Sequence, residues 1–97
     1  MSIEYHLIVN GSLLDDVFKK IKSAFEDNEF YCLEYFSDNT IGLSIKGSSS
    51  DWGADFEITK TDKDLFIEIH SGNYKKILAV IENLLFDNHI SFEFEEE

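Results

Sequence analysis

The sequence has 97 residues, with 20 Asp and Glu against 8 Lys and Arg, and a formal net charge of −12. This length allows one small domain, and we expect residues 1–97 to form a single globular unit. Leu, Ile, Val and Phe make up about a third of the chain, well above the roughly 20% below which charged chains tend to stay disordered. The strong negative charge repels phosphate backbones and anionic lipids, so we expect neither a nucleic-acid partner nor a membrane.

The chain also lacks the signals of export. No apolar run reaches the length of a membrane-spanning helix, and the first residues carry no basic and apolar leader. A single cysteine, Cys32, excludes an internal disulfide framework. These features predict a protein of the reducing cytoplasm.

The chain begins with a predicted strand followed by a predicted helix. Apolar residues alternate with polar ones from Ile3 to Val9, which indicates a strand. Apolar residues then recur at helical spacing and predict a helix from Leu13 to about Asp27. Ser12 stands three residues before Asp15, as in an acidic variant of the capping box.

Four strands are predicted in the middle of the chain. The aromatic stretch 30–36 favours a strand, and alternation over 41–46, 54–59 and 65–70 predicts three more. The segment from Gly47 to Gly53 is rich in glycine and serine and predicts a loop.

A second helix and a last strand complete the chain. Asn73 is a suitable helix cap, and an apolar stripe runs from Tyr74 to Leu85. Asn88 is the expected left-handed residue that ends this helix. Alternation from Ile90 to Glu95 predicts the final strand.

The element order β-α-β-β-β-β-α-β predicts an α+β fold. Short connections imply a mostly antiparallel sheet, and one apolar stripe on each helix places both helices on one face of it. We therefore expect a two-layer, ferredoxin-like sandwich enlarged by an extra hairpin, with the strand order undetermined. The uncovered face would carry Glu4, His6, Ser44, Lys46, Asp55, Glu57, Glu68, His70, Glu93 and Glu95, together with Ile8 and Phe66.

The sequence shows no pattern for catalysis, a metal or a cofactor, so we expect a protein that is not an enzyme. Cys32 lies among apolar strand residues and is expected to be structural. The three histidines have no metal-ligand spacing, although His6 and His70 can share the open face beside Glu4 or Glu68. The Gly-Ser loop lacks the lysine and following helix of a phosphate loop.

The open acidic face is the best candidate for a binding surface. Its ordinary interpretation is a solvated face that keeps the protein soluble, but the excess of acids is larger than solubility needs. Trp52, in the loop, is either an interface anchor or a plug at the end of the sheet. The predicted partner-binding residues are Asp51, Trp52, Asp55, Glu57, Glu68, His70, Glu93 and Glu95.

In size, charge and architecture the chain resembles the small acidic immunity proteins of contact-dependent growth inhibition and other bacterial polymorphic toxin systems. The resemblance covers the whole chain and includes no diagnostic motif. It implies a cytoplasmic inhibitor without a cofactor that binds and neutralises a cognate toxin domain, with a basic nuclease as the expected toxin type. Carboxylates on a rigid sheet can take the place of substrate phosphates, and opposite charge speeds encounter.

Two other interpretations stay open. A small regulatory or adaptor domain would bind a ligand or a protein through a sheet edge or a dimer interface. An enzyme would need a deep pocket with a strongly shifted carboxylate pKa. A monomer or a weak homodimer fits the immunity hypothesis.

Overall fold

The computed structural model describes residues 3–47, 54–70 and 73–97. The elements follow the predicted order, with a short 3-10 turn (η1) added before the first helix. Their bounds are β1 Ile3–Val9, η1 Gly11–Leu13, α1 Leu14–Glu26, β2 Tyr31–Phe36, β3 Thr40–Ile45, β4 Phe56–Lys60, β5 Leu65–Ile69, α2 Tyr74–Asp87 and β6 Phe92–Glu96.

The six strands form one sheet in the order β2-β3-β4-β5-β1-β6, and every neighbouring pair is antiparallel. Without β3 and β4 the order becomes β2-β5-β1-β6, which is the interleaved pair of split β-α-β units of a ferredoxin-like sheet. The β3–β4 hairpin is therefore the extra one, and it lies between β2 and β5. The predicted α+β sandwich is confirmed.

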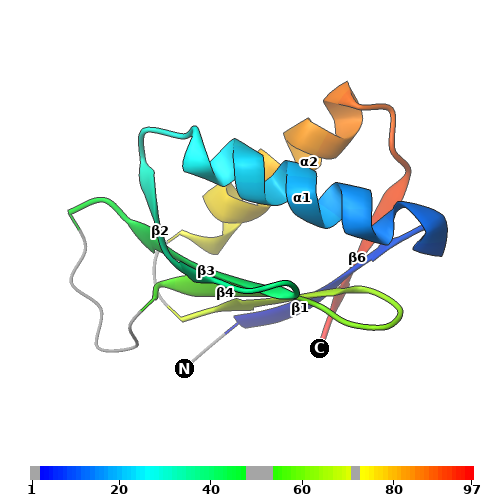
Figure 1. Cartoon of the computed structure of the whole chain (residues 1–97), viewed down its shortest axis with the longest axis horizontal. Coiled ribbons are helices and arrows are strands. Elements are labelled where there is room, and N and C mark those ends of the chain that lie inside the picture. Colours follow the sequence, from blue (N-terminus) through cyan, green and yellow to red (C-terminus); the bar gives the residue numbers. More distant parts are fainter. Residues whose placement is uncertain (1–2, 48–53, 71–72) are drawn as a thin grey trace.

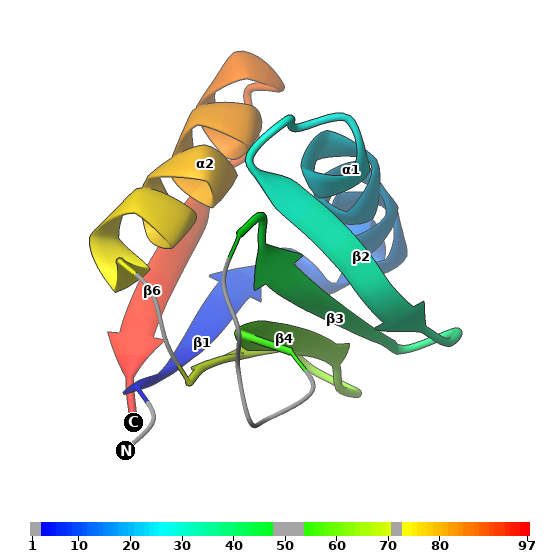
Figure 2. The same ribbon diagram turned by 90° about the vertical axis from the view of Figure 1, so that its left-hand side faces the viewer.

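Both helices lie on one side of the sheet (Figure 1, Figure 2). Apolar residues of the two helices and of one sheet face pack into a single core. Its largest fully buried side chains include Phe25 of α1, Ile81 of α2 and Phe56 of β4. Phe25, Tyr31 and Phe56 also meet edge to face, with ring centroids 5.1 to 5.7 Å apart.

The helix ends differ from the predicted caps at two points. The side chain of Asn10 accepts from the Ser12 amide at 3.0 Å and caps the 3-10 turn, so the capping box of Ser12 and Asp15 is wrong. At the end of α2, His89 rather than Asn88 takes the left-handed conformation, with φ of 57°. Asn88 instead donates its side-chain amide to the Leu84 carbonyl at 2.8 Å. The predicted cap of α2 is confirmed, because Asn73 accepts from the Lys76 amide at 3.3 Å.

Candidate functional site: the open acidic face

The strand register fixes which side chains share the face opposite the helices. Residues of the core face pair with one another, as Ile58 does with Ile67, so the alternate positions point to the open side. Lys60, the one lysine inside the strands as described, lies on the helix side, where its ammonium contacts the Phe18 ring and Asp15. The open-face positions are Cys32, Tyr35, Thr40, Gly42, Ser44, Glu57, Thr59, Phe66, Glu68, Glu4, His6, Ile8, Glu93 and Glu95.

A row of three carboxylates crosses the centre of this face. Glu57 of β4 is directly opposite Glu68 of β5, and Glu68 is directly opposite Glu4 of β1. Like charges at directly opposed cross-strand positions are destabilising. The row, defined as Glu57, Glu68 and Glu4, is therefore an unfavourable arrangement unless a proton or a cation reduces its charge.

His70 lies at one side of this row, just after β5. Its Nε2 is 3.5 Å from a Glu57 carboxylate oxygen and 3.8 Å from one of Glu68, and about nine-tenths of its side chain is buried. One ligand atom from each of the three residues lies within 4.8 Å of the other two. The two carboxylates at this spacing can together receive one cationic group.

The electrostatics of Glu68 reflect its position. Burial is the largest cause that raises its pKa, and the hydrogen bond with Glu4 and the negative charges of Glu4 and Glu57 add to the increase. The charge of His70 acts in the opposite direction. Glu68 therefore holds its proton more tightly than an isolated glutamate does, and a cation that binds beside it competes with that proton.

Tyr35 provides an aromatic border for the row. It is opposite Gly42 on β3, and its ring occupies the space that a Cβ at Gly42 would need. Partial burial raises the pKa of Tyr35 to about 12, and Glu57 contributes as a hydrogen-bond acceptor and a negative charge. The Tyr35 side chain is 42% exposed, so a neutral phenol is available to a partner beside Glu57.

The other end of the face combines a histidine with apolar side chains. The His6 Nδ1 lies 2.9 Å from Asp64, and its Nε2 lies 3.4 Å from Glu97. The His6 ring packs against Phe66 with centroids 5.1 Å apart, and the half-buried Ile8 is two residues further along β1. The open face thus has an acidic centre and a partly apolar end.

The structure places five of the eight predicted partner-binding residues around this face. Glu57 and Glu68 belong to the row, His70 contacts both, and Glu93 and Glu95 lie on the neighbouring edge strand β6. The predicted positions of Asp51 and Trp52 fall outside the described residues.

The expected exposure of Asp55 is wrong. Asp55 precedes β4 and is fully buried, and its carboxylate accepts from the Ile45 amide at 2.7 Å. Its backbone also bridges two strands, since its amide donates to Leu43 and its carbonyl accepts from His70. A carboxylate used in this way is structural and does not face a partner.

Lys46 and Cys32 lie outside the acidic row. Lys46 follows the end of β3, is exposed and is among the residues that line a cavity beside α2. Cys32 is half-buried and lies opposite Ser44 on the open face, and its expected structural role stays a prediction.

Two residues at the acidic centre of the face, Glu4 and Tyr35, were not among the predicted binding residues. Glu4 was placed on the open face, but only the register shows that it extends the row beyond Glu68. Tyr35 reaches the open face because the pairing of β2 with β3 shifts between Leu33 and Tyr35. Neither the shift nor the register has a local sequence signal.

Within the described part of the chain, no helix is long and apolar enough to cross a membrane. Comparisons with family models, with curated proteins and with solved structures found no match to the chain.

Proposed function

We propose that this protein is an immunity protein that binds a cationic toxin domain through its open sheet face and neutralises it in the cytoplasm. The observation that carries the proposal is the row of Glu57, Glu68 and Glu4 on a face where the described strands place no lysine. A basic nuclease is the expected toxin type, because a site built for phosphates also accepts carboxylates.

The geometry supports a protein partner in two ways. An arginine or lysine placed between Glu57, Glu68 and His70 would offset the mutual repulsion of the row. Around that centre, Tyr35 and Phe66 offer aromatic area of the kind that dominates binding energy at interfaces. An acidic centre bordered by aromatic and apolar side chains is suited to a cationic protein surface.

The two edge strands are poorly suited to pair with a strand of another protein, which argues against an adaptor domain that binds in this way. The edge strand β6 carries Glu93, Glu95 and Glu96, and charged side chains discourage pairing with another strand. The opposite edge strand, β2, contains the register shift between Leu33 and Tyr35. An irregular edge is likewise a poor template for a further strand.

The test uses the C-terminal domain encoded by a neighbouring gene for a large secreted protein. That domain is expressed in bacteria with and without this protein, and growth and complex formation are measured. The account predicts growth arrest by the domain alone and rescue by this protein. A toxic domain that this protein neither binds nor neutralises would contradict the proposal.

A charge-reversed variant tests the role of the face itself. Glu57→Lys with Glu68→Lys should abolish rescue. The matched control is Glu82→Lys with Asp87→Lys, which makes the same change in net charge at two exposed positions of α2, and it should rescue growth as the wild type does. Full rescue by the first variant would place the interface elsewhere.

A further inference from the structure

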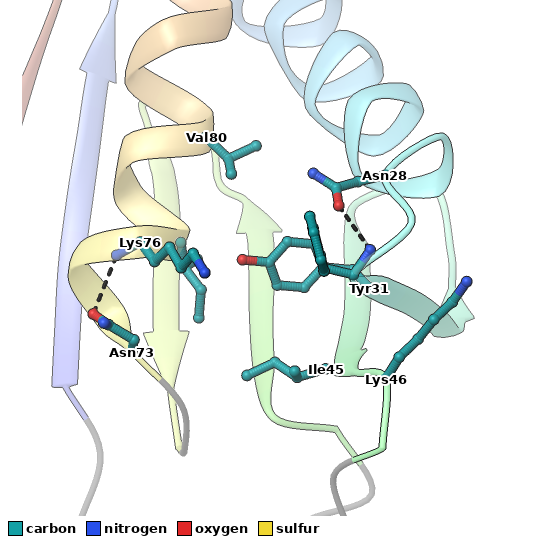
Figure 3. Close-up of a pocket in the computed structure, with 9 residues that line it drawn as sticks. Asn28, Tyr31, Ile45, Lys46, Asn73, Lys76 and Val80 are labelled. Atoms are coloured by element: carbon teal, nitrogen blue, oxygen red, sulfur yellow. Dashed lines mark hydrogen bonds between the residues drawn. The ribbon is translucent and has the colours of Figure 1, made fainter.

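A cavity of about 430 Å³ opens between α2 and the adjoining ends of β2 and β3, in the layer of the helices. Its walls are mostly apolar and include Phe30, Tyr31, Ile45, Ile77 and Val80 (Figure 3). This volume is in the range of small-molecule sites, which are typically apolar with a few placed polar groups. No aspartate or glutamate lines the cavity among the described residues, although the chain has 20 acids.

The hydroxyl of Tyr31 is directed into this cavity. Tyr31 is only 7% exposed, and its hydroxyl points toward the ammonium of Lys76 (Figure 3). Burial raises the pKa of Tyr31, so the hydroxyl is a neutral donor at physiological pH. It makes no hydrogen bond with any residue that the structure describes. The Tyr31 oxygen is accessible from the cavity, so it is available to a ligand.

Lys76 supplies a positive charge across from the Tyr31 hydroxyl. It forms no ion pair with the described part of the chain, and its ammonium lies 5.7 Å from the centre of the Phe30 ring. Lys46 also lines the cavity, but its ammonium is directed away from it (Figure 3). Lys76 and Tyr31 therefore face each other across the cavity, and the amide side chains of Asn28 and Asn73 also line it.

The start of α2 adds to the attraction for an anion. Asn73 caps this helix, and the first turn contains Lys75 and Lys76 but no acidic residue. Cations at the positive end of a helix are unfavourable, whereas an anion there is favourable. The first turn of α1, by contrast, has the usual acids, Asp15 and Asp16.

We propose that this cavity binds a small organic monocarboxylate with an apolar body. The carboxylate would lie between the Lys76 ammonium and the Tyr31 hydroxyl, and the apolar body would pack against Ile45, Ile77 and Val80. The site is on the helix side of the sheet, so it is independent of the acidic face and of the proposed toxin.

The test is a titration of the full chain followed by two-dimensional amide NMR, with octanoate as the probe. Octanamide, which has the same chain length and no charge, is the matched ligand. Octanoate should shift the amide signals of Tyr31, Ile45 and Ile77 saturably, and octanamide should bind about tenfold more weakly or not at all. Absence of saturable shifts with octanoate, or equal binding of the two ligands, would overturn the proposal.

Three variants separate this site from a general charge effect. Lys76→Gln should weaken octanoate binding about tenfold. Tyr31→Phe should weaken octanoate binding several-fold, because it removes the hydroxyl but leaves the ring contacts with Phe25 and Phe56 in place. Lys75→Gln is the control, because it removes an exposed charge from the same helical turn at a residue that does not line the cavity. An equal loss of affinity in the Lys75 and Lys76 variants would contradict a specific site.

Discussion

Glu57 and Glu68 stand directly opposite each other on β4 and β5, and His70 Nε2 lies within 3.8 Å of a carboxylate oxygen of each. Glu4 extends the same row on β1. The fold thus gathers like charges on adjacent central strands, where their repulsion reduces stability. Binding of a cationic partner would convert this unfavourable arrangement into an interface.

The first prediction concerns the cost of the row to the unbound protein. Glu68→Gln removes the central charge and should raise the free energy of unfolding at pH 7 by a few tenths to about 1 kcal/mol. The raised pKa of Glu68 means that the folded state binds this proton more tightly than the unfolded state. The contribution of Glu68 to stability therefore falls as pH rises from the unfolded pKa of Glu through the raised folded pKa.

The pH dependence provides the check on this prediction. Urea unfolding at pH 7 and pH 4 should show the advantage of Glu68→Gln at the higher pH and little of it at the lower. Glu93→Gln is the control, because Glu93 lies on the same face opposite the uncharged Ile8. If Glu68→Gln destabilises the protein at pH 7, or if its advantage is the same at both pH values, the row is not a source of repulsion.

The second prediction concerns the buried carboxylate of Asp55. Asp55→Ala leaves the Ile45 amide without its acceptor and should lower the free energy of unfolding by about 1–3 kcal/mol. Asp38→Ala, in the exposed turn between β2 and β3, should change it by no more than about 0.5 kcal/mol. Equal urea midpoints for the two variants would show that Asp55 has no structural role.

The third prediction concerns the packing of the Tyr35 ring against Gly42. Gly42→Ala places a methyl group where the tyrosine ring lies and should cost about 1 kcal/mol as the ring moves away. In a Tyr35→Ser background the same substitution should stabilise the strand by several tenths of a kcal/mol, because alanine suits a strand better than glycine. A double-mutant cycle measured in urea tests this change of sign, and additive effects would contradict the contact.

The local patterns of the sequence predicted much of this fold, and the long-range pairings explain what they missed. The apolar stripes of α1 and α2 and the alternation in β4 and β5 were enough to place both helices on one face. The order of the strands depends on contacts between distant segments, so the row of Glu57, Glu68 and Glu4 could be predicted only as a shared face.

Asp55 shows why alternation alone misplaces a side chain at a strand entrance. Asp55 is two residues before Glu57, so strict alternation would place it on the open face, but β4 begins only at Phe56. The chain before the strand turns the Asp55 carboxylate toward the Ile45 amide, where it is buried. A buried backbone donor requires such an acceptor, and this need is not visible in the sequence.

The association rate with the proposed toxin domain, measured at a series of salt concentrations, shows whether the acidic face guides binding. We expect the wild type and the Glu82→Lys, Asp87→Lys control to associate quickly at low salt and more slowly as salt increases. Glu57→Lys with Glu68→Lys should associate slowly at every salt concentration. A rate that is unaffected by salt and equal in all three proteins would contradict binding through the acidic face.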